Sequence, residues 1–329
     1  MIIDKNLNWA VLGTGVIANQ MAQALQKMGK NLYAVANRTH SKALSFAEKY
    51  GVEKVYDSID EVFTDENVDI IYITTPHNTH IQYICKALEN KKHVFCEKAI
   101  TLNSGELEEA VKLAEENGVI IAEAMTIWHM PLYKKLWQIA QSGKLGKLQL
   151  IQLNFGSFKD YDMSNRFFNI NLAGGALLDI GVYSLSLARS FMSSQPTEVK
   201  SQVKFAESGV DEQASIIMMN DESEMATITL SLHSKQPKRA VISFEKGYIE
   251  IMEYPRADKA IIVDAETGEK TEILEGKTEL ALMYEMEDME HAVKSGDLSG
   301  LKLDNTIDVM KIMTDLRKEW GLVYPEERR

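Results

Sequence analysis

Short apolar runs and helical patterns alternate along the first 125 or so residues, and this alternation is the strongest constraint on the fold. Runs rich in β-branched residues predict strands at 9–12, 32–36, 70–74, 93–95 and 119–122. The segments between them carry apolar residues at helical spacing and predict helices at 17–28, 41–50, 81–89 and 104–117. Repeated strand–helix–strand units build a parallel sheet covered on both faces, and such sheets bind ligands beyond the carboxyl ends of their strands.

After Glu123 the pattern changes. Helices are predicted at 131–142 and 173–192, around an extended run at 148–155. Strand-like segments follow at 198–205, 213–219, 225–232, 240–244, 248–252 and 260–263, and helices at 279–294 and 304–320 end the chain. We therefore expect two domains: a doubly wound α/β domain over 1–124, and an α+β domain over 125–329 whose large sheet is mostly antiparallel.

The composition narrows the choice of partners. Among 329 residues, 36 are basic and 48 are acidic, and the formal net charge of −12 argues against nucleic acid or an anionic membrane as a partner. Cys85 and Cys96 are too few for a disulfide framework or a structural zinc site, so the expected compartment is the reducing cytoplasm. The first six residues contain no long apolar run, and no apolar stretch of about 18 residues is expected later. We predict a soluble, unprocessed protein without a membrane anchor.

A glycine-rich turn, Gly13-Thr14-Gly15-Val16-Ile17-Ala18, joins the first predicted strand to the first predicted helix. The glycines allow a tight turn and a close approach of the backbone to a pyrophosphate, while the amino end of the helix offers NH groups and positive potential. The third position of the pattern only has to be small, which Ala18 satisfies. The turn predicts a dinucleotide-binding Rossmann domain with Gly13, Gly15, Val16 and Ile17 at the cofactor. A purely structural glycine turn is the alternative.

The residues after the second predicted strand should contact the adenosine ribose of the cofactor. NAD enzymes often place an acid about 20 residues beyond the glycine turn, where its carboxylate repels a 2′-phosphate. This segment, Asn37-Arg38-Thr39-His40-Ser41-Lys42, contains no acid, and Arg38 and Lys42 could both meet a phosphate. We therefore favour NADP(H) and keep NAD(H) as possible. On the alternative interpretation, both cations are ordinary surface residues.

A second unusual stretch, at 174–183, combines a glycine pair with an acid and a phenol in apolar surroundings. In a helix, Asp179 and Tyr183 lie on one face, one turn apart. An unperturbed phenol has a pKa of about 10, so a tyrosine acts as a base near neutrality only beside a cation that favours its phenolate. Lys98, which follows a predicted strand, is a candidate for that cation. Together with the dinucleotide site, these residues predict a nicotinamide-dependent dehydrogenase or reductase that needs no metal. A buried structural tyrosine and a solvated lysine are the alternatives.

These motifs together resemble the glucose-fructose oxidoreductase/inositol dehydrogenase group, Gfo/Idh/MocA, over nearly the whole chain. The resemblance rests on the glycine turn, Thr75-Pro76-His77-Asn78-Thr79-His80, Glu97-Lys98, Leu145-Gly146 and the helix at 174–183. Inositol dehydrogenases of this group have a histidine where this chain has Tyr183. The chain is more similar to the dihydrodiol dehydrogenases, xylose dehydrogenases and glucose-fructose oxidoreductases.

The resemblance implies a role for each matching residue. Lys98 orients substrate and cofactor, Tyr183 handles the proton, and Asp179 supports them. Besides the glycine turn, the residues expected at the cofactor are Asn37 and Arg38, from the segment after the second strand, and Thr75, Pro76, His80, Glu97 and Lys98, from the matching motifs. One position departs from the group, because its usual Glu-Lys-Pro triplet ends in Ala99. Proline would fix the backbone after the lysine, and alanine leaves it freer.

Other polar residues have two interpretations each. The pairs Trp128-His129 and Arg166 with Asn169 are candidate substrate contacts, or else packing and surface residues. No acid accompanies His77 and His80, so capping or a ribose contact is favoured over a metal site. The acidic run at 285–290 is expected on the solvated face of a helix.

The preferred function is hydride transfer between a nicotinamide and a sugar, vicinal diol or related small hydroxy or keto compound. The alternatives are a reductase of sugar-derived ketones or dicarbonyls, and a non-catalytic nucleotide-sensing regulator of the same fold. Residues 226–230 alternate strictly between apolar and polar, which indicates a sheet with one face left to bury. We therefore predict a homo-oligomer, a dimer, formed through that open face.

Overall fold

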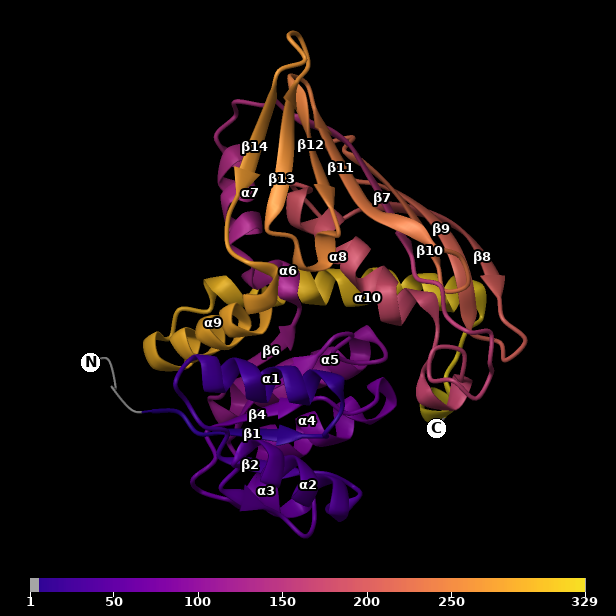
Figure 1. The fold of residues 1–329 in the computed structure, drawn as a ribbon. Helices are drawn as coiled ribbons and strands as arrows, with labels where there is room; N and C mark the ends of the chain where they lie inside the picture. The colour runs from indigo at the N-terminus through magenta and orange to yellow at the C-terminus, as the bar shows by residue number, and fades with distance from the viewer. Residues whose placement is uncertain (1–5, 329) are drawn as a thin grey trace. The chain divides into compact units, whose positions relative to one another are not determined.

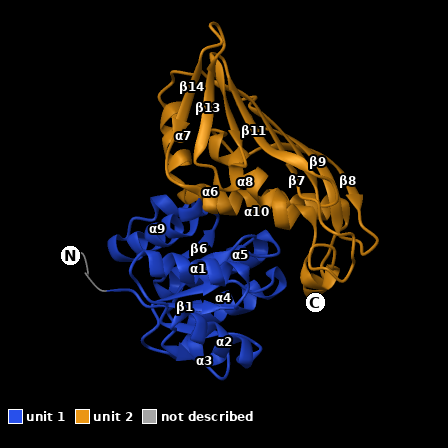
Figure 2. Cartoon of the chain, in the orientation of Figure 1, with its two compact units in different colours: residues 1–125, 279–303 blue, residues 126–278, 304–329 orange. Residues whose placement is uncertain are grey.

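A computed structural model describes residues 6–328, so the prediction for the first five residues lies outside the described range. The chain divides into two compact units (Figure 2). Unit 1 extends to Met125 and includes residues 279–303, and unit 2 comprises residues 126–278 and those from Asp304 onward. The sequence pattern assigned residues 279–303 to the second domain, and the structure differs from it there.

Unit 1 is built on a six-stranded parallel sheet with strand order β3-β2-β1-β4-β5-β6 (Figure 1). Its strands are β1 Trp9–Leu12, β2 Ala34–Ala36, β3 Lys54–Val55, β4 Ile70–Ile73, β5 His93–Glu97 and β6 Ile121–Ala124. Its helices are α1 Val16–Lys27, α2 His40–Tyr50, α3 Asp60–Thr64, α4 His80–Glu89, α5 Ser104–Asn117 and α9 Ala281–Ser295. Every residue of β1, β2, β4 and β6 is buried, so both faces of the sheet are covered. This confirms the predicted doubly wound parallel sheet.

Helix α9 belongs to unit 1 because it packs on α1. Its position corrects part of the expectation for the acidic run: Glu285 and Glu290 are buried, whereas Glu287 between them is exposed as predicted. Glu290 accepts a hydrogen bond from the indole of Trp9 and pairs with Lys30. A buried carboxylate requires such partners, and both come from segments far away in the sequence.

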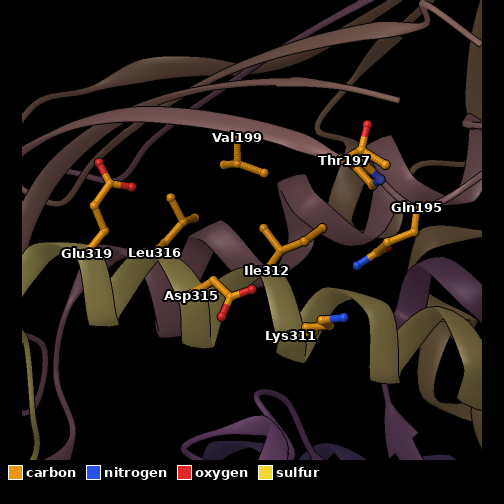
Figure 3. A pocket seen from close by; sticks show the side chains of 9 residues that line it. Gln195, Thr197, Val199, Lys311, Ile312, Asp315, Leu316 and Glu319 are labelled. Atoms are coloured by element: carbon orange, nitrogen blue, oxygen red, sulfur yellow. The ribbon is translucent and has the colours of Figure 1, made fainter. Parts of the chain in front are cut away.

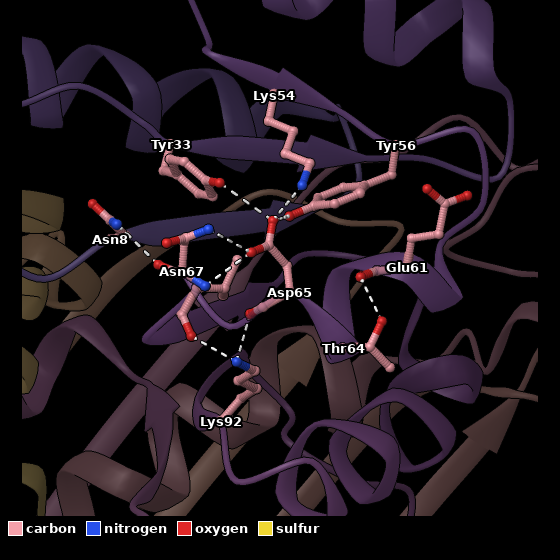
Figure 4. A network of polar contacts seen from close by, with 10 residues as sticks. Asn8, Tyr33, Lys54, Tyr56, Glu61, Thr64, Asp65, Asn67 and Lys92 are labelled. Carbon is pink, nitrogen blue, oxygen red and sulfur yellow. Dashed lines mark hydrogen bonds and ion pairs between the residues drawn. The ribbon is translucent and has the colours of Figure 1, made fainter.

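A polar network connects strand β3 to the segment that precedes β4 (Figure 4). The carboxylate of Asp65 accepts hydrogen bonds from Lys54 Nζ at 2.6 Å and from Tyr56 Oη at 2.7 Å. The backbone N–H of Asn67 donates to the other carboxylate oxygen at 2.8 Å. Burial alone would raise the pKa of Asp65, but these hydrogen bonds outweigh it and hold that pKa well below its usual value.

Unit 2 contains an eight-stranded sheet with strand order β14-β13-β12-β11-β7-β10-β9-β8 (Figure 1). Its strands are β7 Leu148–Gly156, β8 Glu198–Phe205, β9 Asp211–Met219, β10 Met225–Ser231, β11 Gln236–Phe244, β12 Gly247–Met252, β13 Lys259–Asp264 and β14 Lys270–Leu274. Its helices are α6 Thr126–His129, α7 Pro131–Gln141, α8 Val182–Phe191 and α10 Leu303–Trp320. Of its strand pairs, β7 with β10 is parallel and the others are antiparallel, which confirms the predicted mostly antiparallel α+β arrangement.

The two faces of this sheet differ in polarity. On one face Ala226, Ile228 and Leu230 of β10 are buried, and helix α8 packs against β7 and β10. The opposite face carries the alternate residues of each strand. Four large apolar side chains on it are exposed by the stated fractions: Ile217 50%, Met225 37%, Met252 48% and Leu274 62%. This pattern agrees with the strict alternation in the sequence.

One apolar segment corrects the expectation that no long apolar stretch occurs. By length and composition alone, Ile170–Phe191 would suffice to cross a membrane. Within this segment, 78% of the most apolar window is buried inside the protein, as in the core helix of a globular domain. The segment includes α8, which packs on the sheet of unit 2.

Candidate functional site

The glycine turn between β1 and α1 has the backbone geometry that its sequence predicts. Gly13 has a φ of +102°, and a Cβ built there would lie 2.7 Å from Thr74 Oγ1, so only glycine fits. Gly15 is the N-cap of α1, and no atom lies within 4 Å of the place where its Cβ would be. The backbone at Gly15 is therefore accessible to a ligand.

The first turn of α1 is suited to an anion. It contains no acidic side chain, and Val16, its first residue, is 73% exposed. The amide groups at the start of a helix lack intrahelical acceptors and carry positive potential. The four residues predicted from the glycine turn, Gly13, Gly15, Val16 and Ile17, thus form a cradle that fits the pyrophosphate of a dinucleotide.

The segment after β2 adjoins this cradle. Asn37 Nδ2 donates to Thr14 Oγ1 at 2.6 Å, and Asn37 Oδ1 accepts from the backbone N–H of Thr39 at 2.9 Å. Arg38 and Lys42 are exposed, and residues 37–42 contain no acid. The residues present therefore fit a phosphate group on the ribose as well as an unmodified ribose.

Two histidines connect the segment after β4 to the segment after β5. His80 is fully buried, with Nε2 at 2.8 Å from the carbonyl oxygen of Thr75 and Nδ1 at 3.1 Å from that of Ala99. His77 Nε2 lies 3.0 Å from the carbonyl oxygen of Lys98. Burial lowers the pKa of His80. Both ring nitrogens of His80 face protein carbonyls, so its geometry is that of a backbone clamp rather than of a ribose contact.

Two further hydrogen bonds hold the segment around Lys98, whose peptide bond to Ala99 is cis. Glu97 Oε1 accepts the first from the hydroxyl of Tyr72 at 2.5 Å. Glu123, for which no role was predicted, is 1% exposed and accepts a hydrogen bond from the backbone N–H of Ile100 at 3.1 Å. A single acid within the otherwise apolar strand β6 is the sequence signal that marks this residue.

In unit 2, the stretch predicted as one helix over 173–192 consists of two kinds of helix. Leu177–Gly181 form a π-helix, and α8 begins at Val182. A π-turn is wider than an α-turn, and such turns are frequent at functional sites. Asp179 lies within the π-helix and is 9% exposed. Tyr183 lies in the first turn of α8, half-buried, with its ring centroid 6.1 Å from that of Phe155.

The four candidate substrate residues all lie in unit 2 and have different environments. Arg166 Nη2 is 3.6 Å from Asp179 Oδ1, and the side chain of Arg166 is 60% exposed. Asn169 Oδ1 accepts from the backbone N–H of Asn171 at 2.9 Å and caps a short helical turn. Trp128 and His129 are fully buried. Arg166 is thus the candidate whose ion pair reaches a predicted catalytic residue.

A cavity between β8 and α10 of unit 2 contains none of the predicted site residues (Figure 3). Its apolar lining includes Val199, Ile312 and Leu316, and its charged lining residues are Lys311, Asp315 and Glu319. Within residues 6–328, no group of three or more His, Cys, Asp or Glu side chains is placed to hold a metal ion.

Comparisons with known proteins agree with this description. The family model described as "Oxidoreductase family, NAD-binding Rossmann fold" (GFO_IDH_MocA) matches residues 7–125. The model of the GFO/IDH/MocA C-terminal domain matches residues 133–250. The trans-1,2-dihydrobenzene-1,2-diol dehydrogenase of Mus musculus is 28% identical over 336 residues, which cover 98% of this chain and 99% of the relative. Its counterpart in Xenopus laevis is 27% identical and covers 96% of this chain and 99% of the relative.

Solved structures share the whole fold. The aldose-aldose oxidoreductase from Caulobacter crescentus, complexed with glycerol, matches with a TM-score of 0.86 at 20% identity, over 96% of this chain and 98% of that chain. KijD10, a 3-ketoreductase from Actinomadura kijaniata in complex with NADP and TDP-benzene, matches with a TM-score of 0.84 at 19% identity, over 95% and 98% of the two chains. The paired domain matches and the likeness over nearly the full length lead to one conclusion: this chain belongs to the Gfo/Idh/MocA family of oxidoreductases with an NAD-binding Rossmann fold.

Proposed function

We propose that this protein is an NADP(H)-preferring oxidoreductase that interconverts a secondary alcohol and a ketone in a vicinal diol, a sugar or a related small compound. The observation that carries the proposal is the arrangement in unit 2 of the buried Asp179, its ion-pair partner Arg166, and the half-buried Tyr183 that follows the π-helix. The dihydrodiol dehydrogenases similar to this chain over nearly its whole length support the choice of a diol.

The proposed chemistry divides between two kinds of group. The bound nicotinamide supplies the acceptor or donor of the hydride at the reacting carbon. In the oxidative direction the Tyr183 phenolate accepts the proton of the substrate hydroxyl, and in the reductive direction the Tyr183 phenol donates a proton to the carbonyl oxygen. Lys98 donates a hydrogen bond to the same oxygen and favours the phenolate through its positive charge. Asp179, which pairs with Arg166, supports these groups.

The preference for NADP(H) rests on the segment after β2. Arg38 and Lys42 are exposed cations, and the segment lacks the acid that would repel a 2′-phosphate. The structurally similar 3-ketoreductase was solved with NADP, which supports the same choice. NAD(H) is the alternative, because the segment that contains Asn37 would also accept an unmodified ribose.

Consumption of NADPH with a panel of vicinal diketones and ketoses tests the proposal directly, followed by oxidation of diols and aldoses with NADP. We expect turnover, and we expect Tyr183→Phe to lower kcat by about a hundredfold or more while NADPH still binds. Tyr83→Phe, on α4, is the matched control and should retain activity. Turnover of dicarbonyls without any diol oxidation would favour the reductase. Tight NADPH binding without turnover of any substrate would favour a nucleotide-sensing regulator.

We further propose that the protein is a cytoplasmic homodimer whose subunits meet through the open face of the eight-stranded sheet. That face carries the exposed apolar side chains of Ile217, Met225, Met252 and Leu274. Water contact with these apolar side chains is unfavourable, and a second copy of the same face would remove it.

A further inference from the structure

The backbone that leads into the π-helix of unit 2 is held by two buried polar side chains from distant parts of the chain. Asp211, the first residue of β9, accepts a hydrogen bond from the backbone N–H of Leu177 through Oδ2 at 2.6 Å. The hydroxyl of Tyr324, close to the carboxyl terminus, donates to the carbonyl oxygen of Gly174 at 2.6 Å. Asp211 and Tyr324 are both fully buried.

The glycine pair at 174–175 is explained by this close approach. Gly175 has a φ of +126°, and a Cβ built on it would lie 2.1 Å from Asp211 Oδ1 and 3.4 Å from the Tyr324 hydroxyl. A Cβ on Gly174 would lie 2.7 Å from the carbonyl oxygen of Arg166. Any other residue at either position would push the backbone away from its two anchors.

The carboxyl-terminal segment fixes the orientation of Tyr324. The guanidinium of Arg317 on α10 donates two hydrogen bonds of 2.8 Å to Glu327 and lies 4.8 Å from the centroid of the Tyr324 ring. Glu327 also accepts from the backbone N–H of Tyr324 at 3.0 Å. Bidentate pairs of this kind restrict geometry strongly, so Tyr324 has little freedom to leave Gly174.

Backbone hydrogen bonds connect these anchors to the predicted catalytic residues. The N–H of Asp179 donates to the carbonyl oxygen of Gly175 at 3.2 Å, and the N–H of Val182 donates to the carbonyl oxygen of Leu177. The acceptors that set the backbone of Asp179 and the start of α8, where Tyr183 lies, are therefore Gly175, the neighbour of the anchored Gly174, and the anchored Leu177.

Asp211 is an unusual choice for a merely structural anchor. Its Oδ1 is buried and has no hydrogen-bond partner among residues 6–328. Burial raises the pKa of Asp211 to about 7, against the opposing effects of the Leu177 N–H and the positive charge of Arg317. A buried acid of this kind lowers stability near neutrality, and such costs concentrate where function needs them.

We propose that Asp211 is a positioning residue for Asp179 and Tyr183, with Tyr324 as the second anchor of the same backbone. The proposal rests on the proposed function, in which Asp179 and Tyr183 serve the proton transfer. It assigns to β9 and the carboxyl-terminal segment a role in the reaction, although neither touches the reacting atoms.

The test uses Asp211→Asn, Tyr324→Phe and the control Asp221→Asn, which removes an exposed acid from the turn that follows β9. Hydrogen exchange by mass spectrometry measures the backbone at 174–183, steady-state kinetics separate kcat from KM, and calorimetry measures NADPH binding. We expect faster exchange at 174–183 and a kcat lowered by about tenfold to a hundredfold in Asp211→Asn, with a smaller change in Tyr324→Phe. NADPH affinity should be unchanged in both, and the control should match the wild type.

Unchanged exchange at 174–183 in both variants would overturn the proposal. A fall in kcat accompanied by an equal loss of NADPH binding would also overturn it, because such a result indicates general damage. If Asp211→Asn does not fold, Tyr324→Phe alone decides by the same criteria. If the wild-type protein has no turnover, the proposed function fails, but the exchange measurement still decides whether Asp211 holds this backbone.

Discussion

Glu290 Oε1 accepts a hydrogen bond of 3.0 Å from the indole Nε1–H of Trp9, although 281 positions separate the two residues in the sequence. Trp9 begins the first strand of the chain, and Glu290 lies in α9, which follows most of unit 2. Both side chains are buried. This bond and the packing of α9 on α1 make a late segment of the chain part of the first unit.

We expect Glu290→Ala to lower the free energy of unfolding by about 2–3 kcal/mol, because the Trp9 N–H would stay buried without its acceptor. Urea unfolding followed by tryptophan fluorescence measures the change. Glu287→Ala, an exposed residue of the same helix, should change the free energy by less than about 0.5 kcal/mol. Equal effects of the two substitutions would contradict the buried bond.

Because the carboxylate of Asp65 accepts several hydrogen bonds in the folded protein, we expect the protein to lose stability in acid. Its pKa is lowered in the folded protein, so its contribution is present above the unfolded pKa of about 3.9 and is lost as the pH falls below it. We expect Asp65→Asn to cost about 2 kcal/mol at pH 7, and less as the pH falls below about 4. Thermal unfolding across that pH range measures the difference. Asp60→Asn, whose side chain is 67% exposed, is the control. A cost that does not depend on pH would contradict the assignment.

For Asp211 we expect the opposite dependence of stability on pH. Its folded pKa of about 7 lies above its ordinary value, so its contribution to stability is present in acid and is lost as the pH rises through about 7. Removing the charge in Asp211→Asn should therefore raise the free energy of unfolding at pH 8 relative to pH 5 by about 3 kcal/mol. Only the pH interval from 5 to about 7 contributes, at about 1.4 kcal/mol per unit. Urea unfolding at the two pH values checks this. If the substitution shifts both values equally, the carboxylate is not titrating in this range.

Substitution of Arg38 should weaken the binding of NADPH selectively. We expect Arg38→Ala to raise the Kd for NADPH by about tenfold to a hundredfold and to leave the Kd for NADH unchanged, because a charge-assisted bond to phosphate is worth about 1.5–3 kcal/mol. Calorimetric titration with each nucleotide measures both constants. Lys27→Ala, at the far end of α1, controls for the loss of one positive charge. An equal rise in the Kd values of both nucleotides would indicate that Arg38 is a solvated surface residue that does not contact the 2′-phosphate.

The open sheet face predicts the oligomeric state. We expect the wild-type protein to have the mass of a dimer in light scattering after size-exclusion chromatography, and Ile217→Glu to have that of a monomer, because the substitution buries a charge at the contact. Leu298→Glu is matched in exposure, since Leu298 and Ile217 are each 50% exposed, and it lies in unit 1. A monomeric wild-type protein at every concentration would refute the proposal.

Local sequence patterns were sufficient for most of the framework. The β-branched runs placed β1, β2, β4, β5 and β6, and the glycine turn located the cradle before α1. Gly13 could be found because its backbone demand, a positive φ beside Thr74, is met by one residue type. Strand β3 has two residues and helix α3 has five, so β3 is too short to form an apolar run and α3 is too short to show a helical period. The roles of Lys98, Asp179 and Tyr183 remain predictions.

Which faces of the helices and strands are apolar can be read from the sequence, because periodicity is a property of neighbouring residues. Which polar residues are buried depends on the tertiary fold, because a buried polar group needs a partner and the partner can be anywhere in the chain. In the sequence, Glu290 resembles a surface acid, but in the structure it is buried against the indole of Trp9. Asp211 merely precedes a predicted strand in the sequence, but in the structure it binds the backbone N–H of Leu177 and lies close to Gly175. The π-helix at Leu177–Gly181 was decided in the same way, since its backbone is anchored by residues from β9 and the carboxyl-terminal segment.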